Sequence, residues 1–279
     1  MLKSKIKVIA LLLVLSSVLA LSGCSDNFEA KWESFWEKRQ DTTTTEGISE
    51  SRTPIPVEAT EIVNYFNGLI ANVKTINPGF NWESTRDVSD AQSSNKLLKA
   101  AVPTVKNYML KSEKKEQTFG EPLTDFFQLA GNPVLSTDVL SATCEQIEDT
   151  YEILITFKDE AVQNTAAITS RYFELESKAE VLAEFQKAKD YLIVSDYDEF
   201  FTGSTIKCVV NRLDDRILNV TYTKSAKITT QVTGAGELTE IGEVDLSFVL
   251  KNDITYKDFV YDDPETTTQA EKINTLIQN

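Results

Sequence analysis

The chain contains no histidine among its 279 residues. Without an imidazole it has no Ser-His-Asp or Cys-His nucleophile, no His-ligated zinc and no histidine acid–base catalyst. Glycine is also scarce, at 10 residues, and the sequence has no glycine-rich phosphate loop, no Gly-x-Ser-x-Gly elbow and no Cys-x-x-Cys pair. Any chemistry is therefore restricted to carboxylate, lysine or tyrosine groups, and we expect neither catalysis nor a cofactor or metal.

Cysteine is nearly absent too, with three residues in all. Cys24 lies close to the start, whereas Cys144 and Cys208 fall in segments whose patterns predict strands. Outside the cytoplasm these two thiols could form a disulfide. The alternative is that they are two separate buried thiols that pack as small hydrophobic groups. Both interpretations stay open, because the sequence does not give the geometry that a disulfide needs.

Positive charge is in deficit, with 28 Lys and Arg against 43 Asp and Glu, for a formal net charge of −15. A surface of this sign repels nucleic acid and anionic membranes, so we expect no nucleic-acid partner. The simplest role of the charge is solubility. An apolar fraction of 41% is ample for a folded core.

Only one apolar run stands out, and it lies at the N-terminus. Lys3, Lys5 and Lys7 precede the segment Val8–Leu21, which only Ser16 and Ser17 interrupt. This segment is shorter than the roughly 20 residues that span a bilayer core. A basic start, a short apolar segment and small residues are typical of a secretory signal.

The end of this leader is Leu21-Ser22-Gly23-Cys24. It resembles the lipobox of bacterial lipoproteins, in which signal peptidase II cleaves before a lipidated cysteine. The resemblance implies removal of residues 1–23, a diacylglycerol anchor and a fatty acid such as palmitate on Cys24, and a place on the extracytoplasmic face of the cell membrane. Ser25 would also allow sorting to an outer membrane. The alternative is an ordinary secretory signal with a chance cysteine.

Residues 24–56 are expected to be the lipid anchor and a flexible tether. Four aromatic residues at helical spacing predict one apolar face that contacts the membrane; they are Phe28, Trp32, Phe35 and Trp36. The alternatives are a helix docked on the main domain and a disordered stalk. Residues 41–56 are rich in threonine, serine and proline, which is typical of a linker.

Residues 57–262 are expected to form a single α+β domain, followed by a tail at 263–279. Apolar residues at helical spacing predict a helix over Ile62–Val73, and weaker patterns predict helices at 97–109, 123–129 and 181–192. Alternation from Phe80 to Arg86 predicts a strand or extended segment.

The second half of the body changes to the period of strands. The stretch around Cys144 and the alternating run Tyr151–Phe157 predict a hairpin. Four more strands are predicted at Thr205–Arg212, Arg216–Val232, Glu243–Leu250 and Ile254–Tyr261, with Asn252-Asp253 as the last turn. This order predicts N-terminal helices packed on a C-terminal antiparallel β-meander sheet.

One acidic group is a candidate ligand site: Asp196, Asp198 and Glu199, between a predicted helix and strand. Such carboxylates could bind calcium or a sugar, although their spacing does not match an EF-hand. The alternative is a solvated turn.

These observations favour a non-catalytic binding or scaffolding module whose partner is a protein, glycan or lipid. The alternatives are a structural envelope protein without a small ligand and a carboxylate-based hydrolase of cell-wall or extracellular polymers. A lipid carrier would enclose a large dry cavity. In its general organisation the chain is similar to many lipoproteins of Gram-positive bacteria.

Overall fold

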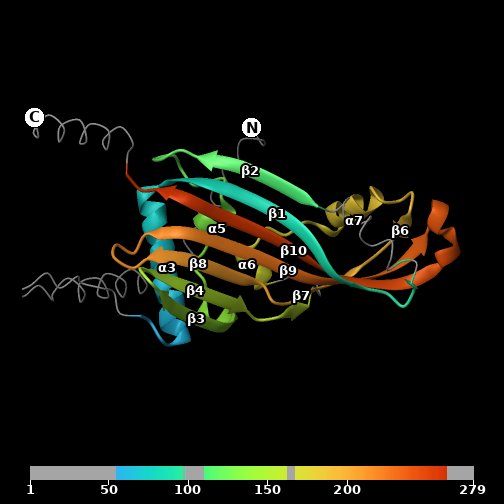
Figure 1. Cartoon of the computed structure of the whole chain (residues 1–279), viewed down its shortest axis with the longest axis horizontal. Coiled ribbons are helices and arrows are strands. Elements are labelled where there is room, and N and C mark those ends of the chain that lie inside the picture. Colours follow the sequence, from blue (N-terminus) through green and yellow to red (C-terminus); the bar gives the residue numbers. More distant parts are fainter. Residues whose placement is uncertain (1–54, 97, 99–109, 162–166, 263–279) are drawn as a thin grey trace, which may run out of the picture. The chain divides into compact units, whose positions relative to one another are not determined.

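The computed structural model describes residues 55–96, 98, 110–161 and 167–262 (Figure 1). They all belong to one compact unit, Ser51–Asn279. The predictions for the leader, the aromatic face, most of the tether and the C-terminal tail lie outside the described residues. The predicted helix at 97–109 also lies outside them, apart from Leu98.

The first described helix, α3 (Ala59–Ile76), confirms the prediction from apolar spacing. Its inward residues recur every three or four positions and are buried; they include Ile62, Tyr65, Phe66, Leu69, Ile70 and Val73. The Glu61 carboxylate accepts the backbone N–H of Glu58 at 3.5 Å, which supports the first turn. The helix ends at Asn77, whose φ of 51° is left-handed.

The described strands form one sheet in which every pairing is antiparallel, so the α+β prediction is confirmed (Figure 1). The strands are β1 (Gly79–Gln92), β2 (Lys111–Gln117), β3 (Val139–Ile147), β4 (Thr150–Phe157), β5 (Glu160–Ala161), β6 (Leu192–Val194), β7 (Asp198–Phe201), β8 (Thr205–Asn211), β9 (Ile217–Gly234) and β10 (Glu243–Val260). The main order is β2-β1-β10-β9-β8-β4-β3, and β6 and β7 also pair with β9.

The predicted hairpin of β3 and β4 is confirmed, but the predicted turn at Asn252-Asp253 is wrong. β10 runs unbroken from Glu243 to Val260 opposite β9. Asn252 and Asp253 do not form a turn because both residues are paired with β1 on one side and β9 on the other. Asp253 accepts a hydrogen bond from the Thr223 hydroxyl at 2.6 Å, and Asn252 lies opposite Lys224.

Several short elements complete the described part. They are α5 (Phe127–Ala130), η2 (Ser136–Asp138), α6 (Thr169–Tyr172), α7 (Lys178–Gln186) and η3 (Gly236–Ile241). The predicted helix at 181–192 is confirmed only in its first half, as α7, which begins earlier because Ser177 caps it by accepting the Glu180 N–H. It ends at Gln186, and Leu192 belongs to β6. In Figure 1, α3 crosses the strands at one end of the sheet and α7 lies toward the other.

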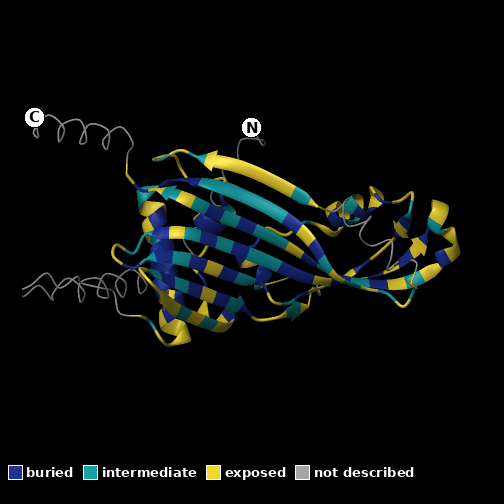
Figure 2. Cartoon of the chain, viewed as in Figure 1, coloured by how far each residue is buried: buried dark blue, intermediate teal, exposed yellow. Residues whose placement is uncertain are grey.

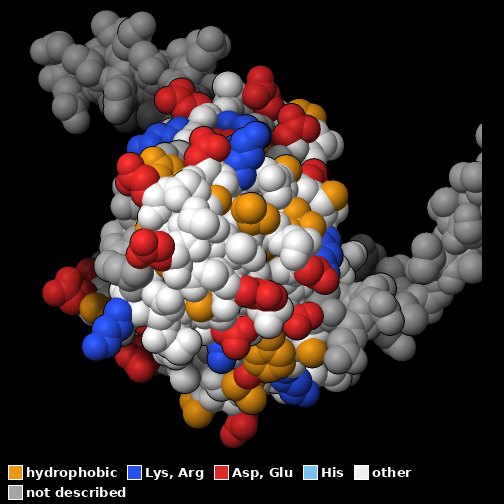
Figure 3. Space-filling view, turned by 90° about the vertical axis from the view of Figure 1, so that its right-hand side faces the viewer, with side chains coloured by type: hydrophobic (Ala, Val, Ile, Leu, Met, Phe, Trp, Pro, Cys, Tyr) orange, Lys and Arg blue, Asp and Glu red, His pale blue; other side chains and the backbone are white. Residues whose placement is uncertain are grey.

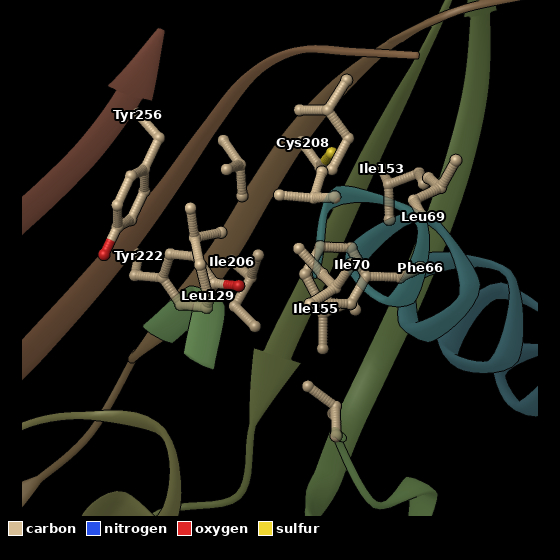
Figure 4. Packing of buried hydrophobic residues seen from close by; sticks show 14 of the residues in the cluster. Phe66, Leu69, Ile70, Leu129, Ile153, Ile155, Ile206, Cys208, Tyr222 and Tyr256 are labelled. Carbon is tan, nitrogen blue, oxygen red and sulfur yellow. The ribbon is translucent and has the colours of Figure 1, made fainter. Parts of the chain in front are cut away.

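Buried and exposed residues alternate along the long strands, so one face of the sheet carries the core (Figure 2). That core has two parts. The α3-side core includes Phe66, Leu69, Ile70, Leu129, Ile153, Ile155, Ile206, Cys208, Tyr222 and Tyr256 (Figure 4). The α7-side core includes Val88, Phe185, Leu192, Phe201, Ala226, Ile228, Val232, Phe248 and Leu250.

The two cysteines of the body are separate thiols. Cys144 and Cys208 pair with Ile153 from opposite sides, so the whole of β4 lies between them. Two strand spacings amount to about 9–10 Å between Cα atoms, beyond the roughly 7 Å that a disulfide spans. The structure accordingly has both cysteines free, with Cys208 buried and Cys144 half-buried.

Candidate functional site

A row of polar residues crosses the core-bearing face of the sheet between the two hydrophobic cores. Arg86 on β1 lies opposite Lys111 on β2 and opposite Asn252 on β10, and Asn252 lies opposite Lys224 on β9. Directly opposite residues project from the same face of a sheet. We call Lys111, Arg86, Asn252 and Lys224 the polar row.

Apolar pairs flank the polar row on both sides. Two residues from Arg86 along β1, Val88 lies opposite Leu250 within the α7-side core. In the other direction, Ile254 lies opposite Tyr222 within the α3-side core. The row therefore interrupts what would otherwise be one continuous hydrophobic core, and such an interruption requires partners for its charges.

The partners come mainly from the segment that joins α6 to α7. Arg86 donates through Nη2 to the Glu176 carboxylate in a partly buried ion pair. The Lys111 ammonium lies 3.8 Å from Glu176 and 3.0 Å from Glu184 on α7. Lys224 instead donates to the backbone carbonyl of Glu174 at 2.8 Å. The segment thus lies over the polar row and neutralises part of its charge.

A pocket of about 270 Å³ opens beside this polar row. It is bounded by β1, β2, β9 and β10, by the segment that leads into α5, and by the segment before α7. Its walls are formed by Trp82, Ser84, Arg86, Lys111, Glu113, Lys115, Asp125, Phe126, Phe127, Gln128, Glu174, Glu176, Lys224, Asn252 and Ile254.

Two buried hydrogen-bond donors in the pocket wall have no partner among the described residues. They are Nε of Arg86 and Nε2 of Gln128, in residues only 8% and 7% exposed. A third such donor, Nε of Arg212, lies outside the pocket wall. The amide of Gln128 is oriented by the Tyr256 hydroxyl, which donates to Oε1 at 2.7 Å and leaves the NH₂ group unused. Leaving a buried donor unpaired costs about 1–3 kcal/mol.

The acids of the pocket wall are not all neutralised either. Glu176 is engaged with two cations, but Glu113, Asp125 and Glu174 form no ion pair with any residue that the structure describes. All three residues are exposed, and Asp125 also accepts from the Thr124 hydroxyl at 3.5 Å. The pocket wall therefore combines two unpaired buried donors with acceptors that are open to solvent.

Burial also shifts the pKa of Lys224 in the pocket wall and of Glu199 near it. Desolvation lowers the pKa of Lys224, and the nearby carboxylates of Glu176 and Glu199 oppose this shift. Desolvation raises the pKa of Glu199, while Lys224 acts in the opposite direction. The surroundings of Lys224 are thus partly shielded from water.

The structure does not bring the predicted acidic group together. Asp196 is exposed and is held by the Lys178 ammonium and the backbone N–H of Tyr197. Asp198 and Glu199 are neighbours in β7, so their side chains project from opposite faces. Only Glu199 faces the core side, opposite Ile228 and near Lys224. No cluster suited to a metal occurs in the described part of the chain.

The pocket itself was not predicted, because it joins segments far apart in the sequence. One signal was available in β1, where the alternation of Phe80, Trp82, Ser84 and Arg86 places an arginine on the core face. A cation at such a position requires a buried partner. The sequence does not show that Glu176 and Gln128 meet it there.

Comparisons with protein-family models, with curated proteins and with solved structures found no match for this chain. Among the residues that the structure describes, no helix has both the length and the apolar character to cross a membrane. Figure 3, which looks at the end of the sheet where β6 and η3 lie, shows acidic and basic side chains spread among uncharged ones.

Proposed function

We propose that this protein is a lipid-anchored binding protein of the extracytoplasmic face of a membrane, without catalytic activity. Its ligand is a small polar molecule held in the pocket beside the polar row. The leader, with Lys3 to Lys7, the apolar run and Leu21-Ser22-Gly23-Cys24, supports the anchor. Residues 24–56 would hold the body away from the membrane.

One observation carries the assignment of the pocket: the unpaired donors on Arg86 and Gln128. Buried polar groups in folded proteins nearly always have partners, and exceptions call for an explanation. A ligand with acceptor atoms would supply the missing partners and recover part of the free energy that these groups lose on burial.

The pocket supports binding better than the competing functions. A lipid carrier needs a large apolar cavity, whereas this cavity is small and lined mostly by polar side chains. A carboxylate hydrolase needs two acids that face each other across the substrate, roughly 5–10 Å apart. Glu176 is already neutralised by Arg86 and Lys111. The other acids of the wall, Glu113, Asp125 and Glu174, are exposed and lack the shielded surroundings that a general acid needs.

Native mass spectrometry of the full chain, prepared from membranes of its own host, tests the pocket. We expect a bound mass that is released on denaturation. The Gln128→Glu variant keeps the acceptor for Tyr256 but loses the NH₂ donor, so it should retain less of that mass. Gln231→Glu makes the same change at an exposed position of β9 and should retain all of it. If all three preparations showed only the mass of the lipidated chain, with no further bound mass, this would contradict a tightly bound ligand.

The anchor has its own test. The denatured chain should have the mass of residues 24–279 plus a diacylglycerol and a fatty acid. The Cys24→Ala variant should lose the lipid and keep residues 1–23, because cleavage requires the lipidated cysteine. A full-length chain without lipid would contradict the anchor but would not bear on the pocket.

A further inference from the structure

We infer that the ligand of the pocket is a neutral, hydroxyl-rich molecule, a sugar of one or two rings. This inference rests on the proposed function and names the class of ligand. It follows from the balance of charge, the mixture of unused donors and acceptors, the order of the charges along β2, and the size of the pocket.

The charges that line the pocket are balanced. Four cations, Arg86, Lys111, Lys115 and Lys224, are accompanied by the four acids Glu113, Asp125, Glu174 and Glu176. A ligand with a net charge would add an uncompensated charge to a partly desolvated site, which is unfavourable. A neutral ligand avoids this penalty.

The polar groups of the wall match hydroxyls in particular. Arg86 Nε and Gln128 Nε2 need acceptors, whereas the exposed carboxylates of Glu113 and Asp125 can exchange bound water for the O–H groups of a ligand. A hydroxyl provides one donor and two acceptor lone pairs, so a sugar ring satisfies both kinds of group at once. An apolar ligand would leave all of them unpaired.

The order of charges along β2 disfavours a zwitterion such as an amino acid. Lys111, Glu113 and Lys115 follow one another on the face of β2 that borders the pocket. Alternating signs give the site no cationic end and no acidic end. A zwitterion needs such a separation, whereas a ring with hydroxyls around its circumference does not.

The dimensions fit a small ring. Ligand pockets usually measure about 300–1,000 Å³, and this one, at about 270 Å³, is slightly smaller. Phe126 and Phe127 add an apolar wall against which the C–H faces of a sugar can pack. The unpaired nitrogens of Arg86 and Gln128 are closed to solvent in this structure, so a ligand can reach them only if the pocket wall rearranges.

Isothermal titration calorimetry with defined sugars tests the inference. The full chain is kept in a detergent without a sugar headgroup and titrated with glucose, N-acetylglucosamine and cellobiose. Glucuronate and glucosamine serve as probes that carry one negative or one positive charge on the same ring. We expect at least one neutral sugar to bind, and its charged counterparts to bind about tenfold more weakly or worse.

Two variants link this binding to the pocket. Gln128→Glu should weaken binding of the neutral sugar by about threefold to tenfold, the effect of one lost hydrogen bond, while Gln231→Glu should leave it unchanged. If Gln128→Glu does not fold, Asn252→Ala removes a different polar group from the same wall.

The outcomes separate the class of ligand from the function. Tighter binding of glucuronate than of glucose would overturn the inference. A second result would also overturn it: no neutral sugar binds up to about 10 mM, while native mass spectrometry still shows a bound mass that Gln128→Glu loses. The pocket would then bind another class of ligand. Absence of both signals would overturn the inference and the proposed function together.

Discussion

Replacing Glu176 by glutamine should destabilise the fold measurably, because Glu176 is the only ion-pair partner of Arg86 among the described residues. Arg86 lies on the core face of β1 with its side chain 7% exposed, and the Glu176 side chain is 30% exposed. The substitution keeps the shape of residue 176 but removes the charge. Arg86 would then be a buried cation without a counterion.

The structure sets the size of this effect. Removing one partner of a fully buried ion pair costs about 3–5 kcal/mol. Glu176 is partly hydrated, and Lys111 retains Glu184 as a second partner, so we expect a smaller loss, about 2 kcal/mol. For a domain of this size that loss corresponds to a fall in Tm of roughly 4–8 °C.

Urea unfolding of the full chain, followed by circular dichroism, measures the loss. The control is Glu174→Gln, two residues earlier in the same segment, where the side chain is exposed and only the backbone carbonyl contacts Lys224. That variant should stay within about 0.5 kcal/mol of the parent. The double variant Arg86→Met with Glu176→Gln should lose less than the sum of its single changes. Equal effects of Glu176→Gln and Glu174→Gln would refute the reasoning.

Three further predictions concern other buried groups. Asn67→Asp should lower the free energy of unfolding in urea by about 2–4 kcal/mol. The buried Asn67 amide donates to the Val134 carbonyl and accepts the Val134 N–H, both at 2.8 Å, and Asp loses the donor and adds a charge. Asn64→Asp, at an exposed position, should cost little, and equal losses would contradict this prediction. Burial raises the pKa of Cys144 to about 11 and that of Cys208 further, so a maleimide should label both thiols slowly in the folded chain and quickly in denaturant, whereas no labelling in denaturant would indicate a disulfide. Burial also raises the pKa of Glu199 above its unfolded value, so the protonated acid is favoured in the fold and stability falls as the pH rises through the folded pKa. Glu199→Gln should therefore raise Tm near neutral pH and have little effect below about pH 4; a Tm difference independent of pH would contradict this.

The elements that the sequence predicts correctly are those set by local patterns. α3 follows from apolar residues at helical spacing, and the β3–β4 hairpin follows from alternation beside a polar step. The turn predicted at Asn252-Asp253 is wrong because the preference of Asn and Asp for turns is a local tendency that strand pairing can override. Here Thr223 binds Asp253, and long strands on both sides hold the pair in the sheet.

The pocket depends on contacts that no local pattern encodes. β1 pairs with β10 from the other end of the body, and this pairing brings Arg86 beside Asn252 and Lys224. Gln128 reaches the pocket only because α5 packs under Tyr256. The sequence does not predict β2, because Lys111–Gln117 is largely charged and shows no alternation of apolar and polar residues. Such a composition is typical of the exposed edge of a sheet.

The most direct test of the account is a crystal structure of the full chain, purified from its own host, at a resolution that shows bound molecules. We expect non-protein density in the pocket within hydrogen-bond distance of Gln128 Nε2, with Tyr256 still bound to Oε1. A Gln128 amide and an Arg86 guanidinium fully paired with protein groups, beside a pocket that holds nothing but disordered solvent, would contradict it.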